Sequence, residues 1–224
     1  MLTKERVFQI MGKYYGNAYY RTAIAHDFSE HDLLLISKAL DEVNAFGYSF
    51  SNLHALSDVE DIRFVPVVLN YFEKFDSIDF QVALLYLICF PSYSEYVPAL
   101  IRIYEKTDSE QIRCAVSQSL LLIRSRRFVP EYLRIIQKRD YGITHDYVMD
   151  LLCKLRVKEA VPKLVELLKT NPHDWRWTFL RYAPLFNEPS LLPYIVPYLE
   201  SEDSELRMLA RKAQKKLSKF IPQI

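Results

Sequence analysis

Residues 95–123 read EYVPALIRIYEKTDSEQIRCAVSQSLLLI, and this stretch decides the fold. Its first part places Pro98 ahead of apolar residues at three- and four-residue steps, the pattern of an amphipathic helix that accepts proline in its opening turn. A polar break, Thr107-Asp108-Ser109, then supplies N-cap residue types, and we expect Asp108 to cap the next helix. A second amphipathic segment follows over 111–124. The stretch therefore predicts a helical hairpin.

The same pattern recurs along the chain. Prolines at 66, 98, 130, 162 and 193 are separated by 32, 32, 32 and 31 residues, and an apolar residue stands six positions after each one: Phe72, Tyr104, Ile136, Leu168 and Leu199. A fixed period of a few tens of residues is typical of stacked repeats, because one hairpin cannot bury its apolar face alone. Only four glycines are present, which disfavours a fold built from strands and tight turns.

The repeating unit, with proline in its first helix and an Asp-x-x-x-Arg-like start to its second, resembles the HEAT repeat. Asp203-Ser204-Glu205-Leu206-Arg207 matches best, and the stretch from Asp108 to Arg113 matches loosely. The resemblance covers roughly residues 63–217 and implies an all-α, right-handed α-α superhelix, a HEAT-like solenoid of about five to seven hairpins. We place its five repeats at 63–94, 95–127, 128–159, 160–190 and 191–217. Residues 1–62 are predicted to be a helical N-terminal capping region, and 218–224 a C-terminal tail.

Length and composition narrow the class of protein. The chain has 224 residues, enough for one domain or one short repeat array. Cys89, Cys114 and Cys153 form no CxxC pair, which favours reduced core thiols over a disulfide framework or a zinc site. The longest apolar run, 82–90, is too short to cross a bilayer. We therefore expect a cytoplasmic monomer that does not bind a membrane, a cofactor or a metal.

Charge is unevenly distributed along the sequence. Residues 1–112 contain 9 Lys and Arg against 16 Asp and Glu, whereas residues 113–224 contain 20 against 12. The two parts carry net charges of −7 and +8, although the whole chain carries only +1. A solenoid with this distribution would be an electric dipole that orients a charged partner as it approaches.

The resemblance to HEAT arrays implies that the second helices line a concave surface. Fifteen residues after the first four prolines stand Gln81, Arg113, His145 and Trp177, and Arg176 and Arg207 lie one position earlier in their repeats. Ser117 and Arg181 follow one helical turn later. These eight residues form the predicted partner-binding ladder, since Arg and Trp often dominate interface energetics. The alternative for Arg113 and Arg207 is pairing with acidic residues of adjacent repeats, a frequent role of that arginine in the family.

No catalytic motif of the Gly-rich loop, HExxH or GxSxG kind is present. We therefore expect a non-catalytic scaffold that binds a protein or peptide, either as an adaptor or as an inhibitor or immunity protein. The alternative is a nucleic-acid-binding protein, including a DNA glycosylase-type enzyme, on the strength of His173-Asp174-Trp175-Arg176-Trp177 and the basic C-terminal half. We favour the simpler explanation of that segment, in which one tryptophan is in the core and Asp174 caps the helix, because large aromatic side chains are usually buried. A lyase acting on a bound chromophore is a weaker alternative, supported by the repeat alone.

Two basic clusters bear on the nucleic-acid alternative. They are Arg124-Ser125-Arg126-Arg127 and the cations between Arg207 and Lys219. An inter-repeat loop and a solvated end cap explain them without a nucleic acid, and the near-neutral total charge favours that explanation. His26-Asp27 and His31-Asp32 are spaced poorly for a metal site, and Ser29 between them is the residue type of an N-cap.

Overall fold

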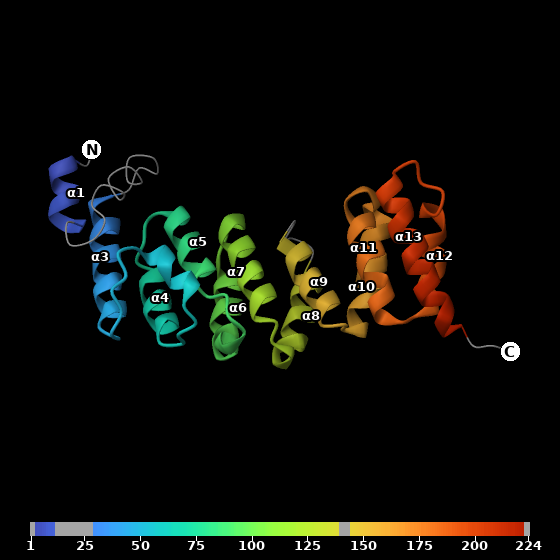
Figure 1. The fold of residues 1–224 in the computed structure, drawn as a ribbon, viewed down its shortest axis with the longest axis horizontal. Coiled ribbons are helices and arrows are strands. Elements are labelled where there is room, and N and C mark those ends of the chain that lie inside the picture. Colours follow the sequence, from blue (N-terminus) through green and yellow to red (C-terminus); the bar gives the residue numbers. More distant parts are fainter. Residues whose placement is uncertain (1–2, 12–28, 139–143, 222–224) are drawn as a thin grey trace. The chain divides into compact units, whose positions relative to one another are not determined.

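The computed structural model describes residues 3–11, 29–138 and 144–221, and these ranges contain helices and connecting turns but no strand (Figure 1). The all-helical class predicted from the sequence is therefore confirmed. The chain divides into two compact units, Met1–Ser125 and Arg126–Ile224. None of the helices in the described ranges combines the length and the apolar character needed to span a bilayer.

Unit 1 consists of a helical N-terminal part followed by two hairpins. Its elements are α1 (Lys4–Met11), α3 (Glu30–Asn44), η1 (Leu53–Asp58), α4 (Phe64–Phe72), α5 (Ile78–Tyr86), η2 (Pro91–Tyr96), α6 (Val97–Lys106) and α7 (Glu110–Ile123). α4 packs on α5 and α6 on α7 within the hairpins, and the second helices α5 and α7 also pack on each other. Helix α3 packs between α1 and α4.

Unit 2 contains three hairpins. Its elements are η3 (Arg126–Phe128), α8 (Val129–Gln137), α9 (Thr144–Lys154), η4 (Lys158–Ala160), α10 (Val161–Thr170), α11 (Pro172–Phe186), η5 (Pro189–Leu191), α12 (Leu192–Ile195), η6 (Val196–Tyr198), α13 (Ser204–Leu217) and η7 (Ser218–Phe220). Each first helix packs on its second helix, and α11 contacts both α9 and α13. Inside each unit, then, successive second helices lie side by side.

The recurring prolines lie where the sequence predicts. Pro98, Pro130, Pro162 and Pro193 occupy the first two positions of α6, α8, α10 and α12, where a missing N–H breaks no helical bond. Short 3-10 turns precede these helices. Helix α12 is the shortest of the four, and it passes directly into η6, whose first turn contains Pro197.

Side-chain caps start three of the second helices, α5, α7 and α13. The hydroxyls of Ser77 and Ser109 accept bonds from Phe80 N and Ile112 N, and Asp203 accepts from Glu205 N and Leu206 N. The expectation that Asp108 caps α7 is therefore wrong by one residue. Ser29 caps α3 in a full capping box with Asp32, as the sequence suggests. These caps satisfy backbone N–H groups that have no partner within the helix.

Hydrogen bonds join neighbouring hairpins inside unit 1. The buried hydroxyl of Ser119 on α7 donates to Leu85 O of α5 at 2.8 Å. The hydroxyl of Tyr71 on α4 donates to Glu42 Oε1 of α3 at 2.6 Å. Asp61 N donates to the hydroxyl of Tyr93 at 2.9 Å. These bonds supplement the apolar packing and fix the register of one helix against the next, since a buried polar group costs free energy unless it is paired.

Candidate partner-binding surface

Three members of the predicted ladder close hairpins. Gln81 Nε2 donates to Phe75 O at 3.0 Å, Arg113 donates to Thr107 O at 2.7 Å, and Arg207 donates to Ser201 O. Each side chain reaches the carbonyl six residues earlier, just before the second helix begins. Each also stands four residues after its N-cap. Thr107 is the C-cap residue of α6, and Phe75 and Ser201 lie in the connections that follow α4 and η6, so these donors satisfy carbonyls that would otherwise need water.

The remaining five predicted residues fall into different environments. Ser117 is fully buried, with its hydroxyl donating to Arg113 O at 2.8 Å, so it does not face a partner. The side chain of His145 lies outside the described part of the structure. Arg176 and Trp177 are half-buried on α11, and Arg181 is exposed one turn later. Of the seven predicted residues whose side chains the structure describes, Arg181 is the one with an exposed side chain.

The solvent-facing side of the second helices is set by positions offset from the predicted ladder. We call the exposed and half-exposed residues on this side the second-helix surface. In unit 1 they follow helical spacing along α5 and α7: Asp79, Ala83 and Tyr86, then Gln111, Cys114, Gln118 and Leu122. Tyr86 is 41% exposed and Leu122 48% exposed. In unit 1 this surface carries its charge at the helix starts, on Asp79 and on the exposed Glu110 of α7, and it contains two large apolar side chains.

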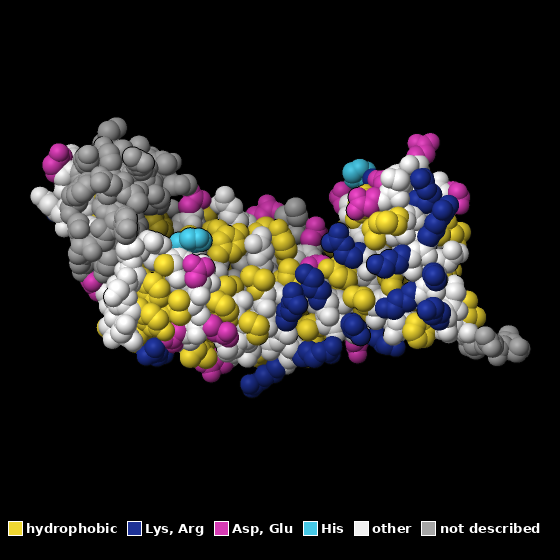
Figure 2. Space-filling model, viewed as in Figure 1, with side chains coloured by type: hydrophobic (Ala, Val, Ile, Leu, Met, Phe, Trp, Pro, Cys, Tyr) yellow, Lys and Arg dark blue, Asp and Glu magenta, His cyan; other side chains and the backbone are white. Residues whose placement is uncertain are grey.

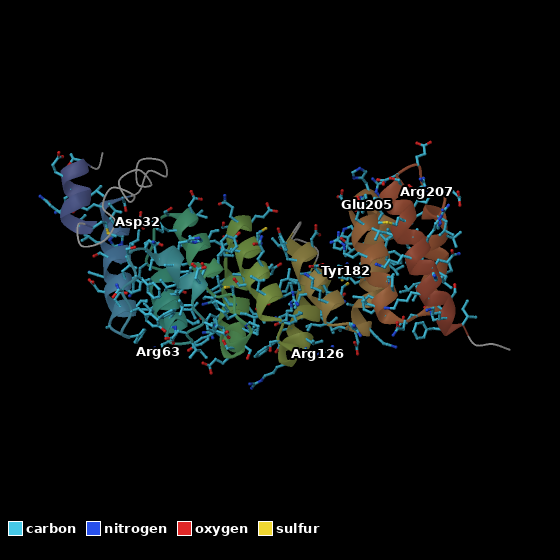
Figure 3. All side chains as sticks on the ribbon, viewed as in Figure 1. Asp32, Arg63, Arg126, Tyr182, Glu205 and Arg207 are labelled. Atoms are coloured by element: carbon cyan, nitrogen blue, oxygen red, sulfur yellow. The ribbon has the colours of Figure 1, made fainter. Side chains whose placement is uncertain are left out.

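In unit 2 the second-helix surface is graded in charge along each helix. It comprises Asp146, Asp150 and Lys154 of α9, Asp174, Thr178, Arg181 and Leu185 of α11, and Glu205, Met208, Lys212 and Lys216 of α13. Carboxylates occupy the first turns and cations the later turns, which is the order that the helix dipole favours. Figure 3 shows Glu205 and Arg207 near the start of α13 and Tyr182 on α11. A partner would meet an acidic edge and a basic edge on the same set of helices.

Two features set the electrostatics of this surface on α9 and α11. Desolvation by neighbouring atoms, and next the negative charge of Asp174, raise the pKa of Asp146 to about 6. Lys154 Nζ lies 2.8 Å from Asp150 Oδ2. The pKa of Tyr182 is also raised, because its phenol is buried and hydrogen-bonds to Asp150. The Asp146 carboxylate therefore takes up a proton at a higher pH than an ordinary aspartate does.

The tryptophan segment is divided between core and surface. Trp175 is buried, and Asn171, not Asp174, is the N-cap position of α11. Asp174 is exposed and accepts from the Asn171 side chain at 2.5 Å. Trp177 stays half-buried. The two indoles therefore do not both line a site, which leaves the glycosylase alternative without the paired aromatic groups that motivated it.

The first basic cluster is bonded to backbone carbonyls. Arg124 ends α7 in a left-handed conformation and donates to Leu121 O at 3.1 Å. Arg126, which is labelled in Figure 3, donates to the carbonyl of Leu155, directly after α9. Arg127 stacks over the Phe128 ring with its guanidinium carbon 5.6 Å from the ring centre. All three arginines thus make a contact within their own unit.

Cavities of small-molecule size open in unit 1, and one of about 490 Å³ is lined by residues of α1 and α3. A cavity of about 360 Å³ opens between α4 and α6 of unit 1 and is lined by Leu69, Phe72, Glu73, Gln81, Ala99, Arg102, Ile103, Lys106, Thr107 and Ile112. Its walls contain no histidine or cysteine. Within residues 3–11, 29–138 and 144–221, no three His, Cys, Asp or Glu side chains cluster closely enough to hold a metal ion. His26 and Asp27 lie outside these ranges, and Asp32 is used in the α3 cap.

No protein-family model matches the sequence, and neither does any curated protein.

Proposed function

We propose that this chain is a non-catalytic HEAT-like solenoid that binds a protein or peptide partner on its second-helix surface. The repeating hairpin supports the architecture: the prolines open the first helices, and polar caps open α5, α7 and α13. The contacts of α5 with α7, and of α11 with both α9 and α13, support this architecture, because they are the contacts expected of stacked hairpins.

The observation that carries the function is the composition of the second-helix surface. Helices in such stacks are covered by their hairpin mate and by their neighbours, so a side chain that stays exposed on them is not needed to fill the core. Tyr86, Leu122 and Met208 are nevertheless large and apolar, and they are 41%, 48% and 58% exposed. Apolar groups ringed by polar ones on a surface are typical of protein–protein contact sites.

The charge gradient of unit 2 adds specificity to this surface. Cations at Arg181, Lys212 and Lys216 would attract the acidic part of a partner, and Asp146, Asp174 and Glu205 would repel it from the opposite edge. Complementary charge raises association rates and rejects wrong partners more than it adds affinity. The half-buried Trp177 lies one turn from Arg181 and supplies an aromatic group of the kind that anchors interfaces.

Site-specific photo-crosslinking in cells tests this proposal. A photoreactive amino acid is placed at Leu122 or Arg181 on the second-helix surface, and at Arg102 or Glu166 on the first helices as matched exposed controls. We expect both surface positions to capture the same protein and the control positions to capture none. Capture from the first helices only, or of unrelated proteins from Leu122 and Arg181, would reject the second-helix surface as the binding site.

A further inference from the structure

The last helix, α13, is cationic beyond its first turn, where Glu205 is its one carboxylate. The buried stripe of α13 consists of Leu206, Ala210, Ala213 and Leu217. The exposed side holds two rows of cations at helical spacing, Arg211, Lys215 and Lys219 in one row and Lys212 and Lys216 in the other. No Asp or Glu occurs after Glu205. The Arg211 guanidinium lies 3.6 Å from Glu200, a long ion pair on the surface.

Exposed apolar side chains accompany these cations. Met208 is 58% exposed and lies one turn before Arg211 and Lys212. Phe220 and Ile221, which directly follow Lys219, are 45% and 50% exposed, and Val196 of η6 is 53% exposed. In Figure 2 the Lys and Arg side chains gather over the C-terminal helices of unit 2, with apolar side chains among them.

A solubilising end cap explains the exposed cations but not the exposed apolar side chains that accompany them. Terminal repeats need a polar outer face because no further repeat covers them. Exposed Met, Phe, Ile and Val side chains work against solubility, so their presence among lysines needs another reason. Lysine mixed with exposed apolar side chains is the composition of helices that lie at a bilayer surface, where cations meet anionic headgroups and apolar groups enter the acyl boundary.

We propose that α13 and η7 bind the surface of an anionic lipid bilayer, without spanning it. This departs from the sequence-based expectation that the chain does not bind a membrane. It goes beyond partner binding by the second-helix surface, with which the lipid-binding face shares Met208, Lys212 and Lys216, and it requires no protein partner. Neither component is sufficient alone: polybasic attraction is reversible and screened by salt, and a few apolar side chains anchor weakly. Together they give a docking face about 12 Å long between Arg211 and Lys219, from the rise of an α-helix.

Lipid is favoured over nucleic acid by the residue types. Four of the five cations are lysines, which act as point charges, and the exposed aliphatic groups of Met208 and Ile221 have no partner along a phosphate backbone. Only Phe220 on this face could stack on a base.

Vesicle co-sedimentation of the full chain tests the proposal. Vesicles of phosphatidylcholine and phosphatidylserine at roughly 3:1 should bind the protein, and phosphatidylcholine vesicles should not, because each basic residue near an anionic surface contributes roughly fivefold to partitioning. Binding should fall as salt rises from roughly 0.05 M to roughly 0.5 M. The variant K215Q/K216Q/K219Q should lose at least about tenfold in partitioning. The control K38Q/K74Q/K106Q removes the same charge from unit 1 and should bind normally.

Two further measurements test the contribution of the apolar side chains and the alternative of nucleic-acid binding. The variant M208Q/F220S should weaken vesicle binding and leave the salt dependence unchanged, since the cations remain. A fluorescein-labelled DNA duplex serves as the competing polyanion. The proposal is overturned if anionic vesicles do not bind at low salt, if both triple variants bind equally, or if the duplex binds more tightly than the vesicles and depends on the same lysines.

Discussion

Replacing Arg113 with methionine tests whether the predicted ladder holds the hairpins together or binds a partner. Methionine keeps most of the apolar stem of arginine but removes its donors. Thr107 O, the C-cap carbonyl of α6, then loses the 2.7 Å bond from the guanidinium. The positive charge also leaves the C-terminal end of α6, where it interacts favourably with the helix dipole.

Hydrogen bonds to charged groups contribute about 1.5–3 kcal/mol to stability. Arg113 is half-buried, so solvent screens it only in part, and we expect Arg113→Met to lower the free energy of unfolding by an amount in that range. For a chain of this size the fall in Tm is roughly 3–12 °C. Arg207→Met should behave alike, since Arg207 makes the equivalent bond to Ser201 O. Gln81→Leu removes a neutral donor and should cost less, about 0.5–1.5 kcal/mol.

Urea unfolding followed by circular dichroism measures these differences. Arg102→Met, an exposed arginine on α6, is the matched control and should change stability by no more than about 0.5 kcal/mol. The loss of stability should be largest for the substitutions of Arg113 and Arg207, smaller for that of Gln81 and smallest for that of Arg102. If Arg113→Met lowers the free energy of unfolding no more than Arg102→Met does, the hairpin-closing role of Arg113 is refuted. The ladder is then again a candidate binding surface.

Three further changes probe individual groups. The Tyr132 hydroxyl is buried without a hydrogen-bond partner, so Tyr132→Phe should leave the urea midpoint unchanged or raise it; a loss above about 1 kcal/mol would reveal a missed partner. The folded-state pKa of Asp146, about 6, exceeds its unfolded value, so its contribution to stability falls as pH rises from about 4 to about 6; Asp146→Asn should therefore stabilise at pH 7 but not at pH 4, as urea titrations at the two values will show. Hydrogen bonds, mainly from Arg63, lower the pKa of Asp61 to about 2. The ionised Asp61 carboxylate therefore stabilises the fold above about pH 4, and this contribution is lost as pH falls toward about 2. In Asp61→Asn the free energy of unfolding should depend less on pH in that window.

The hairpins could be predicted because their signals are local. A proline at a helix start and a Ser or Asp at the next cap act within a few residues, as Pro98 and Ser109 show. The error of one residue at Asp108 has the same origin, since two adjacent residues were both good caps and only the backbone conformation chooses between them.

The side that faces solvent could not be read from the sequence in the same way. Helix α7 is covered by α6 and α5, so more than its apolar stripe is buried, and the small Ser117 and Ser119 lie inside with the carbonyls that their hydroxyls need. Arg113 borders the apolar stripe, and its length lets it turn back along the hairpin. One signal was available: Gln81, Arg113 and Arg207 each stand four residues after a cap, a constant offset that suits a structural bond better than a variable interface.

The affinity of the crosslinked partner for purified variants tests the central claim most directly. Isothermal titration calorimetry should show that Tyr86→Ala/Leu122→Ala raises Kd by at least about tenfold with little loss of stability, because truncating apolar anchors at an interface costs more than 1 kcal/mol each. Arg113→Met should lower stability and leave Kd nearly unchanged. The reverse pattern, with normal affinity in Tyr86→Ala/Leu122→Ala and lost affinity in a folded Arg113→Met protein, would contradict the account.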